Sequence, residues 1–438
     1  MASKPTIQVT VVVLGDLGRS PRMRYHALAL ADSGVEVDLI GYAGSAVPQI
    51  VLQHPRIRCH LMEPAPLGFL DRCKDSLFPA VALVRIAVQA ARLLRLLLFV
   101  VARPDAVLVQ NPPAIPTLIV ALLSARLRSA RLIIDWHNLG YTLLALKLGS
   151  SSPIVRWTRR QERALGRRAD GHLCVSRAMQ LELENNWALP KVALLYDRPA
   201  DGFTPAAPDE RRALLGGLTN VSALVPVEYR LDRQPRPAVL VSATSWTHDE
   251  DFDLLLDALA RCDRTLRPFD GDRGPGRGAR EQLSFPRLLM LITGDGPLRE
   301  FYEARIRDLS LSRIYVQTLW LAPEDYPLLL RAADLGLCLH RSSSVLDLPM
   351  KLADMLGSGL PVCALNYGPC LAEQLRHGEN GLLFSNSAGL AEQILDLFQN
   401  FPDETPLLDR LRRNILQSTR RRWSEEWREQ ARATIIGS

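Results

Sequence analysis

Lys351 lies in the first turn of a predicted helix that starts near Pro349, and this placement suits the binding of an anion. The free amides and the positive dipole end of a helix start attract anions, and the lysine adds a full charge. Asp347 just before the helix and Asp354 within it supply carboxylates for sugar or ribose hydroxyls. The stretch therefore predicts a site for a nucleotide-sugar donor, although an ordinary strand–loop–helix unit shares this pattern.

His137 is the second candidate for chemistry, because it follows a predicted strand and lies two residues after Asp135. Residues two apart in an extended chain share a face, so the carboxylate can orient the ring or raise its basicity. A histidine suits the removal of a proton from a hydroxyl near neutral pH. The alternatives are that Asp135 or Asp16 is the base and that His137 only hydrogen-bonds a neighbouring loop.

Polar loops also follow several strand runs in the second half of the chain. Hydroxyls and amides in 242–246 can hold a diphosphate, and the glycines of 293–298 allow close backbone approach to a nucleotide. The loop 320–326 follows the next strand. The predicted donor-binding residues are Ser242, Thr244, Ser245, Trp246, Thr293, Gly294, Gly296, Trp320, Ser343, Ser344, Asp347, Met350, Lys351 and Asp354.

Apolar strand runs alternate with helical patterns along the whole chain. The strand runs are 7–14, 35–41, 106–109, 131–135 and 171–175, and then 238–241, 288–292, 314–318, 335–339, 360–364 and 382–384. This order predicts an α/β protein with doubly wound parallel sheets. The polar candidates fall just after strand ends, where such sheets bind ligands.

The composition is that of a globular protein, with 438 residues of which 47% are hydrophobic and 23% charged. The net charge of +6 fits anionic partners such as phosphates or a lipid surface, and we expect no nucleic-acid partner. Seven dispersed cysteines without metal-type spacing favour a reducing compartment. The first residues lack the apolar core of a signal peptide.

The chain is too long for one typical core, so we expect two domains. Two Rossmann-like domains whose parallel sheets face across a cleft resemble the GT-B glycosyltransferases. We therefore predict an acceptor domain over 1–198, a linker with an irregular insertion over 199–237 and a donor domain over 238–405. A C-terminal helix over 406–438 is expected to pack back across the cleft, and 270–280 is expected to be a mobile loop.

Six motifs carry a narrower resemblance, to the chitobiosyldiphosphodolichol β-mannosyltransferase family, from about Val9 to Trp427. The motifs are 13–23, 110–113, 135–138, 245–247, 347–351 and 379–382. The resemblance implies transfer of mannose from GDP-mannose to dolichyl-diphosphate chitobiose, in a β-1,4 linkage, at the cytosolic face of the endoplasmic reticulum. It implies acceptor-binding roles for Gly15, Gly18, Arg19, Ser20, Arg22, Asn111 and Asn138.

An α-linked donor that gives a β product requires inversion, so a single displacement with one base suffices. Lys351, the helix start and the loop 242–246 can stabilise the leaving GDP. We therefore expect no metal and no cofactor. The acidic run 249–253 is interpreted as the capped start of a helix.

Membrane attachment is expected to be peripheral, although many members of that family carry an N-terminal transmembrane anchor. Residues 79–102 predict an in-plane amphipathic helix that dips into the leaflet, with a core helix as the alternative. The arginine-rich stretch 156–168 is either a solvated face or a contact for anionic headgroups. Two other function classes remain: a sugar-nucleotide epimerase of the same fold, and a silent paralogue that partners other dolichol-pathway glycosyltransferases.

Overall fold

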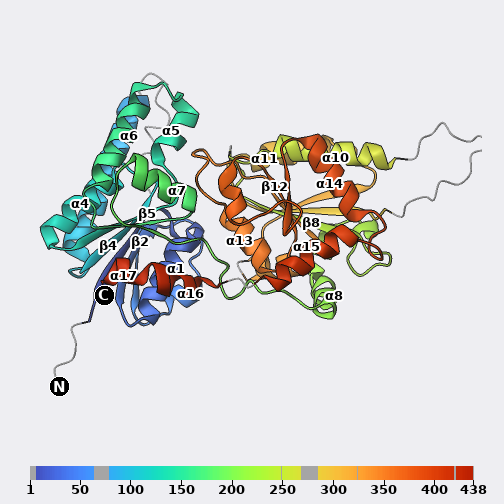
Figure 1. Cartoon of the computed structure of the whole chain (residues 1–438), viewed down its shortest axis with the longest axis horizontal. Coiled ribbons are helices and arrows are strands. Elements are labelled where there is room, and N and C mark those ends of the chain that lie inside the picture. The colour runs from blue at the N-terminus through green and yellow to red at the C-terminus, as the bar shows by residue number, and fades with distance from the viewer. Residues whose placement is uncertain are drawn as a thin grey trace, which may run out of the picture. The chain divides into compact units, whose positions relative to one another are not determined.

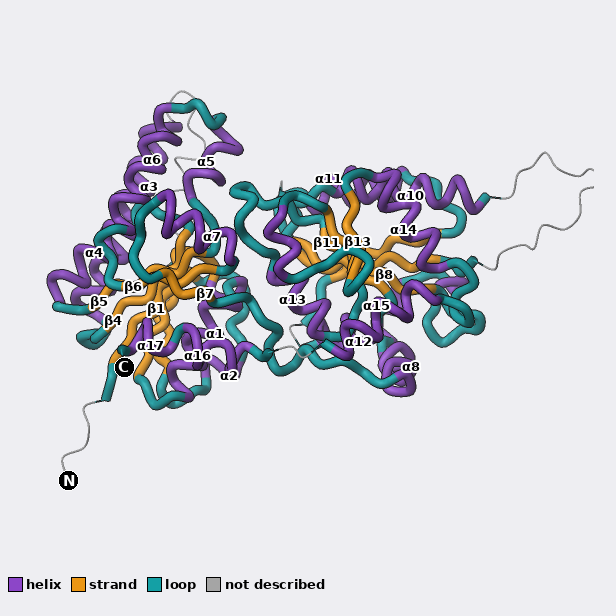
Figure 2. Tube along the Cα trace, viewed as in Figure 1, coloured by secondary structure: helices purple, strands orange, loops and turns teal. Residues whose placement is uncertain are grey.

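The chain forms two compact units, each built around its own parallel sheet. The computed structural model describes residues 6–63, 78–247, 249–267, 285–322, 324–418 and 421–437. Unit 1 comprises Met1–Asp197 and Trp423–Ser438, and unit 2 comprises Arg198–Arg422. The expected mobile loop 270–280 lies outside the described residues. Figure 2 shows strands at the centre of each unit and helices around them.

Unit 1 contains a seven-stranded sheet in the order β3-β2-β1-β4-β5-β6-β7, and every described pair in it is parallel. The strands are β1 Gln8–Asp16, β2 Glu36–Tyr42, β3 Ile57–Met62, β4 Ala106–Asn111, β5 Arg131–Trp136, β6 Gly171–Cys174 and β7 Val192–Leu194. Asp16 and Asn111 are the last residues of β1 and β4, and His137 follows β5; these three strands are neighbours in the sheet. The fold therefore brings these three residues to one sheet edge.

Helices cover both faces of this sheet (Figure 1). They are η1 Leu17–Arg19, α1 Pro21–Asp32, α2 Gln49–Leu52, α3 Phe78–Arg95, η4 Leu96–Val100, α4 Thr117–Arg128, α5 Gly140–Leu148, α6 Pro153–Gly166, α7 Arg177–Leu181, η5 Glu182–Asn186, α16 Trp423–Gln430 and α17 Arg432–Ile436. The last two helices belong to this unit although they follow unit 2 in sequence. Trp427 and Ile435 lie in its hydrophobic core.

Unit 2 contains a six-stranded parallel sheet in the order β10-β9-β8-β11-β12-β13. Its strands are β8 Ala238–Thr244, β9 Leu288–Gly294, β10 Ile314–Leu319, β11 Leu335–Cys338, β12 Val362–Leu365 and β13 Gly381–Phe384. Its helices are α8 Pro208–Gly217, α9 Thr219–Leu224, η6 Val227–Tyr229, α10 Phe252–Leu266, α11 Arg299–Asp308, α12 Asp325–Ala332, α13 Met350–Gly357, η7 Pro369–Glu373, α14 Ser387–Phe398 and α15 Pro406–Gln417. The predicted doubly wound α/β class is thus confirmed for both units.

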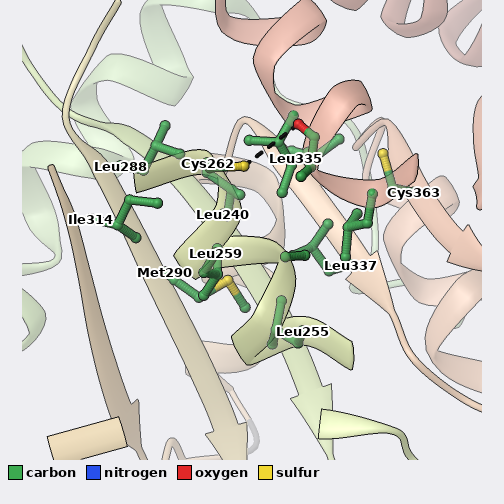
Figure 3. Close-up of a cluster of buried hydrophobic side chains, with 14 of the residues drawn as sticks. Leu240, Leu255, Leu259, Cys262, Leu288, Met290, Ile314, Leu335, Leu337 and Cys363 are labelled. Atoms are coloured by element: carbon green, nitrogen blue, oxygen red, sulfur yellow. Dashed lines mark hydrogen bonds between the residues drawn. The ribbon is translucent and has the colours of Figure 1, made fainter. Parts of the chain in front are cut away.

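The core of unit 2 follows from the spacing of apolar residues on α10. Leu255, Leu259 and Cys262 recur every three or four residues, so they share one helical face and are fully buried. Figure 3 shows this face against strand residues such as Leu240 and Met290. The Cys262 thiol donates a hydrogen bond to a carbonyl oxygen of α14 at 3.5 Å. Each fully buried leucine of this kind stabilises the fold by about 1.5–3 kcal/mol.

Two stretches differ from the sequence-based expectation. The range 199–237, expected to be irregular, contains α8 and α9. These helices are short, and Leu215 is the only buried side chain of α8, all of whose residues the structure describes. The sequence there lacks the regular spacing of apolar residues from which a helix is predicted. The stretch 406–438, expected to be one helix, forms α15, α16 and α17, because the chain passes from one unit into the other between α15 and α16.

The predicted helix over 79–102 forms as α3 and the π-helical turn η4. It has one buried face and one exposed apolar face. Leu93 and Leu97 are buried against unit 1. Leu83, Val84 and Phe99 are exposed, Phe99 by 81%. Among the residues that the structure describes, no helix has the length and apolar character needed to cross a membrane.

Candidate functional site

A buried carboxylate organises the carboxyl edge of the sheet in unit 1. Asp135, near the end of β5, is fully buried. It accepts hydrogen bonds from Arg22 Nε at 2.8 Å and Nη2 at 2.9 Å, from His26 Nε2 at 3.0 Å and from His137 Nε2 at 2.9 Å. These bonds engage both carboxylate oxygens, so Asp135 is a positioning residue rather than an available base.

Arg22 supplies the positive charge of this network and is itself buried. Its Nη1 also donates to the Leu195 carbonyl at 2.9 Å and to Asp197 at 2.8 Å. Burial alone would raise the pKa of Asp135, but Arg22 and then His137 hold that pKa well below its usual range. Arg22 was predicted to bind the acceptor. Its side chain is buried and holds Asp135 in position.

His26 is fixed in one protonation state by a tryptophan from the C-terminal part of the chain. Trp427 Nε1 donates a hydrogen bond to His26 Nδ1 at 2.9 Å. An indole nitrogen can only donate, so Nδ1 must accept and the ring proton must lie on Nε2, facing Asp135. Burial lowers the pKa of His26, which agrees with a neutral ring.

The two ring nitrogens of His137 have different roles, because only Nε2 is bonded to Asp135. Ionised Asp135 only accepts hydrogen bonds, so His137 Nε2 carries a proton and donates it. Nδ1 is then the nitrogen that can take up a proton in a neutral ring. The backbone N–H of His137 donates to the Asn111 carbonyl at 2.9 Å, and its side chain is 20% exposed. This geometry is that of an accessible general base oriented by a carboxylate.

Asp16 organises a loop instead of presenting a free carboxylate. It accepts hydrogen bonds from the Gly18 N–H at 2.9 Å, the Ser45 N–H at 2.9 Å and the Ser45 hydroxyl at 2.7 Å. Burial raises the pKa of Asp16, but the bonds from Ser45 and Gly18 outweigh this and lower it. A Cβ atom at Gly18 would lie 2.4 Å from the Ser45 carbonyl oxygen, so this loop needs glycine there. These bonds make Asp16 a weaker candidate base than His137.

The other predicted acceptor residues surround this edge. Arg19 is exposed and its Nε donates to the Ser45 hydroxyl at 2.9 Å. Ser20 donates to the Asp16 carbonyl at 2.8 Å, and Gly15 is half-buried at the end of β1. Arg19 therefore has the most accessible cation of this loop.

Glu162 is a site residue that sequence reasoning missed. It is buried and accepts hydrogen bonds from Asn111 Nδ2 at 3.0 Å and from the N–H groups of Gly140 at 2.7 Å and Tyr141 at 2.9 Å. Asn111 also donates to the Asn138 carbonyl at 3.1 Å. The carboxylate therefore caps the start of α5 and fixes the loop that carries His137 and Asn138. Glu162 is the one acidic residue within the arginine-rich stretch 156–168, and this position could have singled it out in the sequence.

In unit 2, Lys351 does lie at the carboxyl edge of the sheet, where it forms an ion pair with Glu250. Glu250 is buried and also accepts hydrogen bonds from the Thr244 hydroxyl and, at 2.9 Å, from the Ser245 N–H. Sequence reasoning missed Glu250, because it lies in an acidic run that was interpreted as a helix cap. That interpretation is confirmed for Asp251, which accepts from the Leu254 N–H at 3.1 Å.

A second acidic centre lies in the loop after β11. Asp347 is buried and accepts hydrogen bonds from the Ser342 hydroxyl, from the Ser344 hydroxyl at 3.1 Å and from His340 Nε2 at 3.3 Å. His340 also contacts Asp249 at 3.4 Å through Nδ1. Burial would lower the pKa of His340, but these two carboxylates raise it to about 9. Sequence reasoning missed His340. Its charged ring is a second cation beside the loop that leads to Lys351.

Trp246 does not present its ring at the site. Its indole is fully buried and stacks on Phe252 with ring centres 4.5 Å apart, while Nε1 donates to the Gly294 carbonyl at 3.1 Å. A Cβ atom at Gly296 would lie 1.8 Å from the Ser245 carbonyl oxygen, so the two loops approach each other closely. The side chain of Trp246 therefore shapes the donor loop from the core.

The remaining donor candidates lie in the last residues of β8 and β9 or after β10 and β11, and these four strands are neighbours in the sheet. Trp320 is exposed, Ser242 and Thr293 are buried, and Ser343, Met350 and Asp354 are half-buried. Within the loop 320–326, Pro323 lies outside the described residues. In the described part of the chain, no three His, Cys, Asp or Glu side chains are arranged to hold a metal ion.

Both units match glycosyltransferase models. The model described as a glycosyl transferase 4-like domain matches residues 18–196, and that described as glycosyl transferases group 1 matches residues 238–400. UDP-glycosyltransferase TURAN of Arabidopsis thaliana is 43% identical, with 97% of this chain and 96% of that protein covered. Human chitobiosyldiphosphodolichol beta-mannosyltransferase is 39% identical, with 96% of this chain and 90% of the human protein covered.

The chain belongs to the chitobiosyldiphosphodolichol beta-mannosyltransferase family. As a member of this family it is a glycosyltransferase. Among solved structures, Anabaena HepE in complex with UDP-glucose is similar, with a TM-score of 0.63 at 16% identity, over 96% of this chain and 97% of that chain. This similarity supports the GT-B fold that the sequence predicted.

Proposed function

We propose that this family member transfers mannose from GDP-mannose to the chitobiose of dolichyl diphosphate and forms a β-1,4 linkage at the cytosolic face of the endoplasmic reticulum. The observation that carries the proposal is the near-full-length similarity to several enzymes named for this activity. The geometry at the two sheet edges supports it, because one edge offers a base and the other offers cations.

On the acceptor side, His137 Nδ1 takes the proton from the attacking hydroxyl. The acceptor oxygen forms its bond to the anomeric carbon of mannose while the bond from that carbon to the GDP oxygen breaks on the opposite face. The configuration therefore inverts from α to β in a single displacement. Asp135 holds the ring and stabilises the imidazolium that results.

On the donor side, Lys351 neutralises the diphosphate as it departs. An ammonium group has three donor hydrogens, so Lys351 can keep its bond to Glu250 and donate to a phosphate oxygen as well. The start of α13 adds partial positive charge, whereas the N–H groups of Ser245 and Trp246 are already bonded to Glu250 and Thr244. With these groups the departure of GDP requires neither a metal ion nor a cofactor.

The test is transfer by the purified chain to phytanyl- or dolichyl-diphosphate chitobiose, followed by linkage analysis of the product. GDP-mannose should give one added β-1,4-linked hexose. UDP-sugars are the rival donors to include, because one relative is named a UDP-glycosyltransferase. Transfer from a UDP-sugar alone would overturn the donor. Conversion of a sugar nucleotide without acceptor would indicate an epimerase, and donor binding without any reaction would indicate a silent paralogue.

A further inference from the structure

The positive charge of the chain is concentrated in one segment of unit 1. Between residues 78 and 168 the sequence has fourteen Lys or Arg and three Asp or Glu, which gives a net charge of +11. The whole chain carries +6, so the remaining residues together carry −5. Two of the three acidic side chains, Asp135 and Glu162, are buried in the site described above. The third, Asp105, lies just before β4, at the opposite edge of the sheet.

Helices α5 and α6 form a hairpin within this segment (Figure 1). The hairpin is anchored at its base, because Glu162 of α6 accepts hydrogen bonds from the first amides of α5. Val155, Thr158 and Leu165 of α6 recur at helical spacing and face inward. The two helices meet at a short connection over 149–152, which we call the hairpin tip together with its flanking residues 146–148 and 153–157.

The hairpin tip exposes large apolar side chains next to cations. Leu146 is 63% exposed, Ile154 is 56% exposed and Trp157 is 51% exposed. Lys147 and Arg156 lie beside them and are exposed as well. In α5, which the structure describes in full, no side chain is fully buried, so this helix contributes little to the core. An exposed group of leucine, isoleucine and tryptophan bordered by basic residues is typical of a segment that enters the interface of an anionic membrane.

We infer that the hairpin tip docks on an anionic lipid bilayer, with Leu146, Ile154 and Trp157 among the acyl chains and the arginines of α6 at the headgroups. The inference rests on the proposed function in one respect, namely that the acceptor is attached to a membrane lipid. Its physical basis is the match between a cationic, apolar surface and an anionic, apolar one. Lys147, Arg156, Arg159 and Arg160 are exposed at the tip or beside it, and no Asp or Glu occurs between Asp135 and Glu162, so a bilayer that contains acidic lipids is the complementary partner.

The position of the hairpin in the chain gives this docking a role in catalysis. Helix α5 begins at Gly140, three residues after His137, and its nine residues span about 13 Å. His137 therefore lies about one helix length from the tip. A hydroxyl on the second sugar of a lipid diphosphate also stands away from the bilayer surface, by the length of the diphosphate and the sugars. Docking at the tip would hold the base at the height of that hydroxyl.

The exposed face of α3 and η4 is the rival docking surface, because Leu83, Val84 and Phe99 are exposed there too. Among the contacts that the structure describes, this rival face lacks the direct link to the His137 loop that the hairpin has. The hairpin follows the loop of His137 directly and is bonded to Asn111 through Glu162. The test therefore compares one variant at each surface.

The experiment is flotation of the full chain with phosphatidylcholine vesicles, with and without phosphatidylserine. The variant Leu146→Glu/Trp157→Glu changes two exposed side chains at the tip. Ile50→Glu on α2, 67% exposed in the same unit, is the matched control, and Phe99→Glu tests the rival surface. We expect the wild type to float with acidic vesicles at low salt, the tip variant to lose at least about tenfold in partitioning, and Ile50→Glu to behave as wild type. Melting curves establish that each variant is folded.

The inference is overturned if the tip variant floats as well as the wild type, or if the loss is confined to Phe99→Glu. Absence of wild-type binding to acidic vesicles would also overturn it. Transfer to a short-chain acceptor in detergent separates this inference from the proposed function. The tip variant should keep that rate and lose transfer to acceptor in vesicles. If neither the wild type nor any variant transfers mannose in detergent, while the tip variant still loses flotation, the proposed function fails and the docking inference is supported.

Discussion

The carboxyl edges of the two sheets use buried carboxylates in opposite ways. In unit 1, Asp135 is engaged by Arg22, His26 and His137, so its charge is compensated and its geometry is fixed. In unit 2, Glu250 has a single side-chain cation, Lys351, among its described contacts, and the Lys351 side chain is a quarter exposed. The first arrangement presents the second ring nitrogen of His137, whereas the second presents an ammonium group that has donor hydrogens beyond its bond to Glu250.

This difference matches what each half of a group transfer needs. A base needs a ring nitrogen that can take up a proton, and the bond from Nε2 to Asp135 orients His137 so that Nδ1 is that nitrogen. A site for a diphosphate needs hydrogen-bond donors, and the Lys351 ammonium has donor hydrogens beyond its bond to Glu250. The two edges are therefore built on the same fold but suited to different tasks.

The strongest way to break the comparison is to remove the basicity of His137. The variant His137→Gln keeps hydrogen-bonding capacity but cannot act as a base. We expect the transfer rate to fall by about 10²–10⁴-fold while the affinity for GDP-mannose, which concerns unit 2, stays unchanged. Single-turnover rates and donor titrations on the same preparation measure the two effects.

His60→Gln is the matched control for that variant. His60 lies on β3 of the same sheet, is 20% exposed like His137 and contacts Asp38 at 2.7 Å. Its substitution should leave the rate near that of the wild type. A His137→Gln enzyme with a wild-type rate would exclude His137 as base and return Asp16 and Asp135 to consideration.

The second prediction concerns the cation of unit 2. Lys351→Ala should weaken binding of GDP by about 10–150-fold, because a hydrogen bond to a charged group contributes about 1.5–3 kcal/mol. Glu250→Gln is the control, since it removes the ion pair but leaves the ammonium in place. Calorimetric titration with GDP should show tight binding for Glu250→Gln and weak binding for Lys351→Ala. Equal loss in both variants would mean that Lys351 serves the loop and not the donor.

The sequence predicted those parts of the molecule that depend on local pattern. Alternating strand and helix signals predicted both parallel sheets, and the spacing of Asp135 and His137 predicted a contact that exists at 2.9 Å. Arg22 was assigned to the acceptor, because nothing local shows that it pairs with an aspartate 113 positions away. The contact between His26 and Trp427, 401 positions apart, has no local signature either.

The missed residues of unit 2 have a related cause. Glu250 lies in a run of acidic residues in which any member can cap a helix, and only the fold selects Asp251 for that role. His340 gains its charge from two carboxylates that come from different loops. Local sequence shows that charged groups are present but does not show which of them become buried together.

The third prediction tests whether the C-terminal helices fix the geometry of unit 1. Trp427→Phe removes the N–H that His26 Nδ1 accepts and should cost about 1–3 kcal/mol of unfolding free energy. It should also lower kcat several-fold without changing KM for the donor, since Asp135 would lose its fixed partner. Denaturant unfolding and steady-state kinetics measure the two effects.

Trp423→Phe is the matched control on the same helix. Within the described residues, the Trp423 Nε1 is buried without a hydrogen-bond partner, so Trp423→Phe removes ring packing but no hydrogen bond and should cost less stability than Trp427→Phe. Equal losses in the two variants would show that the aromatic packing of α16 matters rather than the bond to His26.

The last prediction uses pH to separate the two units. In unit 2, His340 is held charged: its pKa is raised to about 9, so its contribution to stability is full below about pH 6.5 and is lost as pH rises towards 9. In unit 1, His172 is held neutral: burial lowers its pKa to about 4, so its contribution is full above about pH 6.5 and is lost as pH falls towards 4. Each effect has a slope of at most about 1.4 kcal/mol per pH unit.

Denaturant unfolding of the wild type, His340→Gln and His172→Gln across pH 4–9 measures both effects. The difference between wild type and His340→Gln should shrink on the alkaline side, and that for His172→Gln should change on the acid side only. If the two units unfold in separate transitions, each change should follow the transition of its own unit. Parallel curves for wild type and His340→Gln between pH 6.5 and 9 would show that His340 is not held charged. The contrast between a base in unit 1 and cations in unit 2 would then rest on Lys351 alone.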